Sequence, residues 1–73
     1  MPLIQVKVME QVFTPTQKQE IIAKLTDAMV AIEGESLRPY TWVMIEDIRS
    51  GDLGIGGRAL GTADVQALAE AKK

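Results

Sequence analysis

The sequence has neither cysteine nor histidine among its 73 residues. Disulfides are therefore excluded, and a structural zinc site is nearly excluded because its usual ligands are missing. Cysteine nucleophiles, serine–histidine–aspartate triads, HExxH metal sites and CxxC redox pairs each need one of these residue types. These four kinds of site are therefore excluded as well. We expect a protein without a metal ion or cofactor.

The sequence also lacks an excess of basic residues. Eight basic residues stand against ten acidic ones, and no basic run extends beyond the pair Lys72-Lys73, so we expect no nucleic-acid partner. No stretch approaches the roughly 20 apolar residues of a membrane span, and Met1–Gln5 lacks the features of a signal peptide. We therefore expect a cytoplasmic protein that does not bind membranes.

The small size of the chain predicts a single domain over residues 1–73 that needs outside support. A chain this short buries only roughly 60% of the surface that its unfolded form exposes, and one such core typically contributes about 3 to 5 kcal/mol of net stability. Since disulfides are excluded, self-association is the remaining common way to stabilise the fold.

A strand and a long helix are predicted in the first half. Residues 3–9 alternate, with Ile4, Val6 and Val8 on one face, which is typical of a strand. Thr14, Pro15 and Gln17 have the spacing of a capping box, so a helix is predicted over residues 14–33. Its expected buried stripe repeats at three and four residues: Ile21, Ile22, Leu25, Ala28, Met29 and Ile32.

A second strand is predicted over residues 40–47, where Pro39 biases the preceding residue toward an extended backbone. Strand, helix and strand form a βαβ unit of an α/β protein, with parallel strands and a right-handed crossover. A two-stranded sheet leaves unpaired backbone groups along both edges, so this unit is expected to pair with another copy of itself.

The last third is punctuated by glycine. Residues 50–58 predict a turn or short hairpin, and residues 62–71 predict a tail or short helix. Gly54-Ile55-Gly56-Gly57-Arg58-Ala59 matches a dinucleotide fingerprint in form, but only fourteen residues follow Ala59. The fingerprint also needs an acidic residue about 20 residues later, and this context is not found here, so nucleotide binding is not expected.

Pro2 is a candidate catalytic residue. Removal of Met1 would leave a proline with a free secondary amine at the mouth of the first strand. An α-amino group has a reference pKa of about 7.7 to 8, and burial in an apolar pocket lowers it further. Such an amine can act as a general base or a nucleophile near pH 7 without any histidine. The alternative is that Pro2 is simply the unpaired start of a strand.

Several features occur together: Met1-Pro2 opening a strand, a helix near Gln17–Glu20, a strand ending in Ile45-Glu46-Asp47, and Gly54-Ile55-Gly56-Gly57. This combination resembles the 4-oxalocrotonate tautomerase family over about the first 60 residues. The resemblance implies a βαβ protomer with a short C-terminal hairpin. It also implies dimers with a four-stranded sheet, assembled into a homohexamer, and Pro2 as the catalytic base.

The chain departs from this family where two arginines hold the substrate's carboxylates. The first would fall at Val12 and Phe13 and the second at Trp42, while an aromatic residue of the family aligns with Leu53. Losing both guanidinium groups removes bidentate carboxylate recognition, so 4-oxalocrotonate itself is not an expected substrate. We expect a substrate pocket formed by Val12, Phe13, Trp42, Leu53 and Arg58. Arg58 is the first choice for a displaced cation, ahead of Arg38 and Arg49.

The expected function is proton transfer between the enol and keto forms of a small enol or 2-keto acid, with Pro2 as base. The apolar pocket would favour a neutral amine and an aromatic or apolar substrate. Two alternatives keep the amine but use it for hydrolytic dehalogenation or for iminium formation with a carbonyl compound. A third alternative is a non-enzymatic oligomeric scaffold, because a fold alone does not establish a function.

Overall fold

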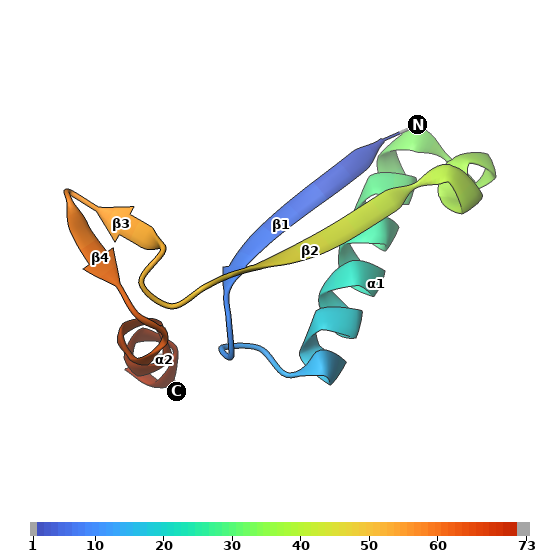
Figure 1. The fold of residues 1–73 in the computed structure, drawn as a ribbon. Coiled ribbons are helices and arrows are strands. Elements are labelled where there is room, and N and C mark those ends of the chain that lie inside the picture. The colour runs from blue at the N-terminus through green and yellow to red at the C-terminus, as the bar shows by residue number, and fades with distance from the viewer. Residues whose placement is uncertain (1, 72–73) are drawn as a thin grey trace.

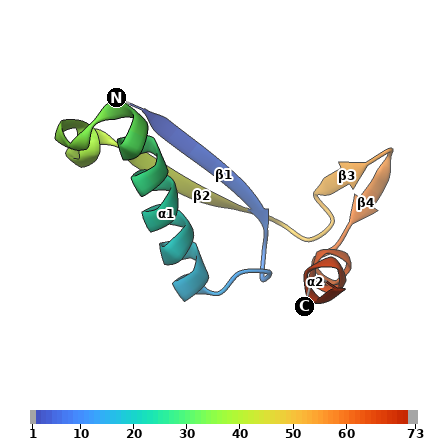
Figure 2. The same ribbon diagram turned by 180° about the vertical axis from the view of Figure 1, so that it is seen from behind.

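The computed structural model describes residues 2–71, and a parallel βαβ unit forms its larger part (Figure 1). Strands β1 (Leu3–Met9) and β2 (Trp42–Ile48) pair in parallel, from Leu3 opposite Trp42 to Met9 opposite Ile48. Helix α1 (Pro15–Glu33) connects them and packs on one side of the two-stranded sheet (Figures 1 and 2). The predicted α/β fold class with a parallel βαβ unit is confirmed.

The capping box fixes the start of α1. Thr14 is the cap residue, and its hydroxyl accepts a hydrogen bond from the Gln17 backbone N–H at 3.1 Å. The Gln17 side chain in turn accepts one from the Thr14 backbone N–H at 2.9 Å. Pro15 occupies the first turn, where its missing N–H leaves no intrahelical bond unmade. The local sequence therefore places this helix end.

The predicted buried stripe of α1 was partly wrong. Val30 is the buried residue of the helix, at 4% exposure, whereas Ile32 is 85% and Ile22 is 38% exposed. Successive α-helical residues turn by about 100°, so Ile32 lies about 200° around the axis from Val30 and faces away from the sheet. The apolar spacing alone did not reveal which side of the helix meets the strands.

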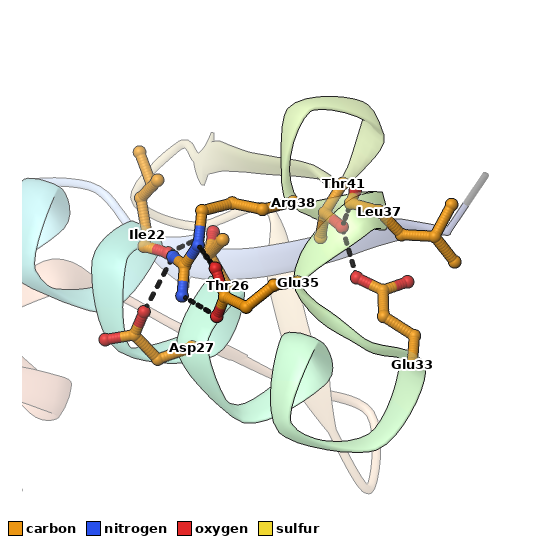
Figure 3. Close-up of polar contacts among 8 residues, drawn as sticks. All are labelled: Ile22, Thr26, Asp27, Glu33, Glu35, Leu37, Arg38 and Thr41. Atoms are coloured by element: carbon orange, nitrogen blue, oxygen red, sulfur yellow. Dashed lines mark hydrogen bonds and ion pairs between the residues drawn. The ribbon is translucent and has the colours of Figure 1, made fainter.

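A 3₁₀ helix, η1 (Glu35–Tyr40), occupies the region before β2, where the sequence predicted a plain connection and the start of a strand. Tyr40 was thus wrongly placed in the strand, which begins at Trp42. Figure 3 shows the Arg38 guanidinium between two carboxylates: Nη1 donates to Asp27 of α1 at 2.9 Å, and Nε and Nη2 donate to Glu35 at 3.0 Å. These bonds hold η1 on α1 and so set where β2 starts.

A hairpin and a second helix complete the described chain. Strands β3 (Leu53–Ile55) and β4 (Arg58–Leu60) pair antiparallel around Gly56 and Gly57, whose φ angles are 60° and 84°. A two-residue turn with both φ angles positive matches the twist of a hairpin and strongly favours glycine. Helix α2 (Thr62–Ala71) follows. The hairpin and α2 lie apart from α1, beyond the end of the sheet where β1 and β2 finish (Figure 2).

The protomer is more open than a self-contained domain. Its radius of gyration is 14.8 Å, against about 11 Å for a compact chain of this length. Its accessible surface is 5496 Å², against about 4,500 Å² for a folded monomer of this mass. Among the described residues, the buried apolar residues are Met9 and Val30, each 4% exposed. On the sheet face away from α1, Leu3, Trp42 and Met44 are 53%, 61% and 42% exposed.

Candidate functional site

Pro2 lies at the entrance of the sheet, immediately before β1. Its carbonyl accepts a hydrogen bond from the Trp42 backbone N–H at 3.0 Å. This bond belongs to the parallel ladder in which Trp42 stands opposite Leu3, and it connects the Trp42 backbone directly to Pro2. The ring of Pro2 is half-buried. The structure therefore brings together the predicted base and one member of the predicted pocket.

Three other predicted pocket residues gather at the opposite end of β1. Val12, Phe13 and Leu53 line an apolar groove of about 360 Å³, together with residues from β1 and α2. A second, more polar groove of about 460 Å³ adjoins it and shares Val12 and Phe13. We call the first one the apolar groove; its further lining includes Lys7, Val65, Leu68 and Ala69.

Helix α2 is held at this groove by long-range hydrogen bonds. The Thr62 hydroxyl donates to the Glu10 carbonyl at 3.1 Å, and Gln66 Nε2 donates to the Gln11 carbonyl at 2.7 Å. Gln11 has a φ of 62°, a left-handed conformation that is uncommon for residues other than glycine. The turn that presents Val12 is thus stabilised by contacts from the C-terminal helix.

Pro2 does not meet the apolar groove within one protomer. Lys7, the lining residue of β1 that comes first after Pro2, is five residues further along the chain, which at about 3.3 Å per residue corresponds to about 16 Å. One copy of the chain therefore carries the predicted pocket in two parts: Pro2 with Trp42 at one end of the sheet, and Val12, Phe13 and Leu53 at the other.

The arginines considered as replacement cations lie outside the apolar groove. Arg58 is in β4, where its side chain is 75% exposed and lies 3.7 Å from an Asp64 carboxylate oxygen. Arg38 is paired with two carboxylates. Its hydrogen bonds, mainly the one with Glu35 and next the one with Asp27, raise the pKa of the guanidinium above its ordinary value. Neither guanidinium lines the apolar groove.

Sequence reasoning missed Lys7, Val65 and Leu68 as groove residues. Val65 and Leu68 are three residues apart, the spacing that places two side chains on one helix face. Lys7 was seen only as a polar position in an alternating strand. The available signal was weak, because nothing local indicates that α2 packs beside the end of β1.

No helix in residues 2–71 combines the length and the apolar character needed to cross a membrane. Over the same range, no cluster of three or more acidic side chains has a geometry suited to a metal ion.

Comparison with protein families matches the model described as "Tautomerase enzyme" to residues 2–63. A search of curated proteins finds no similar sequence. The matched segment contains the whole βαβ unit and the hairpin, and it ends just after α2 begins. With the first matched residue at Pro2 and most of the chain covered, this protein belongs to the tautomerase enzyme family.

Proposed function

We propose that this protein catalyses proton transfer between the enol and keto forms of a small enol or 2-keto compound, with the Pro2 amine as general base. The observation that carries the proposal is the family membership, whose matched segment begins at Pro2. Removal of Met1 is required, because a peptide bond would turn the amine into an amide without basicity. The free amine has the reference pKa of an α-amino group, about 7.7 to 8, which suits a base near neutral pH.

The reaction moves one proton and creates no net charge. The neutral Pro2 amine takes the proton of the enol hydroxyl while the C–O bond gains double-bond character. The resulting ammonium then returns the proton to the neighbouring carbon, and the product is the ketone. Negative charge builds on the oxygen between these steps, so a second group must stabilise it. Proton transfer by a positioned base contributes typically 10² to 10⁴ in rate.

Two copies of the chain would complete the site. Strand β1 has a free edge, and antiparallel pairing of two β1 edges gives a four-stranded sheet. This pairing sets the start of one β1 opposite the end of the other. Pro2 of one copy then comes near the apolar groove of the second copy, which explains how a base about 16 Å from the groove within a protomer can act there.

Higher assembly is proposed on the open face of the sheet. Leu3, Trp42 and Met44 are exposed apolar residues on that face, and the protomer has about 1,000 Å² more surface than a compact monomer of its mass. Packing three four-stranded sheets through these faces would cover the exposed residues and give a homohexamer. Such a contact would also place Trp42 in an aromatic wall near Pro2.

The test combines mass with activity. Intact mass of the purified protein reports whether Met1 has been removed, and ultraviolet absorbance follows ketonisation of phenylenolpyruvate. We expect loss of one methionine and enzyme-dependent ketonisation that disappears when the N-terminal amine is acetylated. A processed protein whose ketonisation rate is the same before and after acetylation would exclude Pro2 as the base.

A further inference from the structure

Some basic side chains of residues 2–71 form ion pairs with carboxylates and others do not. Ion pairs involve Lys18 with Asp47 at 2.8 Å, Lys24 with Glu20 at 2.7 Å, and Arg38 and Arg58 with the carboxylates described above. Within residues 2–71, this leaves Lys7 and Arg49 without a carboxylate within ion-pair distance. Of these two, only Lys7 lines the apolar groove.

Apart from Lys7, the residues that line the apolar groove are all apolar. The other lining side chains come from aliphatic residues, Met9 and Phe13, and include Val65 and Leu68 of α2. Leu68 is 68% exposed, so its side chain is accessible to a ligand from solvent. Both α2 residues lie beyond residues 2–63, the segment that the family model matches.

We infer that the apolar groove binds a monocarboxylate with an aromatic-sized apolar group, with Lys7 pairing the carboxylate and Leu68 and Val65 contacting the apolar group. The role of the apolar groove as a substrate site rests on the proposed function. The preference of the groove for this ligand class rests only on the residues that line it. Lys7 thereby supplies the positive charge that the absent arginines do not.

Size and charge both favour this occupant. An apolar cavity of about 150 Å³ can hold a benzene ring, and the groove has about 360 Å³. One ammonium group matches one carboxylate. A dicarboxylate would bring its second charge against apolar walls without a partner, which is unfavourable because the charge loses its hydration. The groove thus selects against the doubly charged acids that two arginines would hold.

The test measures binding to the full, Met1-processed protein by isothermal titration calorimetry. trans-Cinnamate carries a phenyl group and one carboxylate, cinnamamide lacks the charge, and muconate carries two carboxylates. We expect cinnamate to bind at least about tenfold more tightly than either of the others. Binding of muconate equal to or tighter than that of cinnamate would overturn the inference.

Variants then assign the two parts of the site. Lys7→Gln is expected to weaken cinnamate binding about tenfold and leave cinnamamide unchanged, while Lys7→Arg restores the binding. Leu68→Glu is expected to weaken both ligands. Ala67→Glu adds the same charge to the neighbouring residue of α2, which does not line the groove, and is expected to bind both ligands normally. Unchanged cinnamate binding in Lys7→Gln would refute the assignment of Lys7.

Two further outcomes separate this inference from the proposed function. Normal cinnamate selectivity in a processed protein that ketonises no enol would uphold the groove as a binding site and refute the catalytic proposal. Ketonisation with Lys7→Gln and Leu68→Glu both at the wild-type KM would uphold catalysis and overturn the groove assignment. Failure to bind cinnamate, with a lower oligomer mass in Leu68→Glu, would show that a second copy fills the groove and would also overturn it.

Discussion

The Pro2 carbonyl accepts a 3.0 Å hydrogen bond from the backbone N–H of Trp42. This bond fixes the position of Pro2 through its carbonyl and leaves its nitrogen out of the sheet's hydrogen-bond ladder. A general base needs a lone pair that is not used in a structural hydrogen bond, and it must be held in a defined position. The bond also means that a substitution at Pro2 can change the amine without removing the contact that anchors the chain's start.

Pro2→Ala is expected to lower kcat for enol ketonisation by about 10² or more, since it replaces the positioned secondary amine. Oligomer mass should stay unchanged, because alanine keeps the carbonyl that pairs with Trp42. Stopped-flow absorbance and light scattering check the two expectations. Pro39→Ala makes the same change in η1 and should retain the wild-type rate. A Pro2→Ala variant as fast as this control would contradict the assignment of the base.

Trp42→Glu is expected to reduce the size of the assembly. It places a charge on the open sheet face, where Trp42 is 61% exposed beside Leu3 and Met44, and a charge buried there without a partner is strongly unfavourable. Size-exclusion chromatography with light scattering measures the mass. Gln19→Glu, an exposed substitution on α1, is the matched control. Equal masses for the two variants would show that the open face is not an interface.

Thr14→Ala removes the hydroxyl that caps α1 and is expected to lower the free energy of unfolding by about 1 kcal/mol. Urea denaturation at a fixed protein concentration measures this, since the stability of an oligomer depends on concentration. Thr16→Ala changes an exposed threonine two residues further along, in the first turn of α1, and should have a much smaller effect. If both variants lose the same stability, the capping box is not what stabilises the helix end.

Acid should weaken the contact between η1 and α1. The hydrogen bonds from Arg38 lower the pKa of Glu35 below its ordinary value of 4.5. A carboxyl group with a lowered folded pKa stabilises the protein above its unfolded pKa, and this contribution is lost as pH falls through the folded value. Thermal unfolding below pH 4.5 should therefore show a steeper loss of stability in the wild type than in Arg38→Gln. Arg49→Gln should keep the wild-type slope; equal slopes in all three proteins would contradict the expectation.

Gln66→Ala removes the 2.7 Å hydrogen bond to the Gln11 carbonyl and is expected to loosen α2. Backbone amides of α2 should exchange hydrogen several-fold faster, because the helix loses a tether to the turn after β1. Amides of β1 and β2 should exchange as before. Hydrogen exchange with mass spectrometry resolves these segments, and Gln19→Ala serves as the control. Unchanged exchange in α2 would mean that packing alone holds the helix.

The local features of the fold were readable from the sequence because each depends on neighbouring residues. Alternation fixed β1 at residues 3–9, the capping box fixed the start of α1, and paired glycines predicted the hairpin turn. Errors arose where distant contacts decide. Arg38 reaches back to Asp27 and shapes η1, which shifted the start of β2, and the orientation of α1 left Ile32 exposed.

The candidate site divides in the same way. The sequence by itself offered Pro2 as a base candidate, because a processed N-terminal proline carries a secondary amine. The missing arginines and the pocket residues near positions 12 and 53 came from the resemblance to the tautomerase family. Only the tertiary structure decided that Pro2 and the apolar groove lie at opposite ends of β1, and that Lys7 and α2 belong to the groove. The contacts that decide this join residues as far apart as Gln11 and Gln66. Such contacts depend on the path of the whole backbone, which no short sequence pattern encodes.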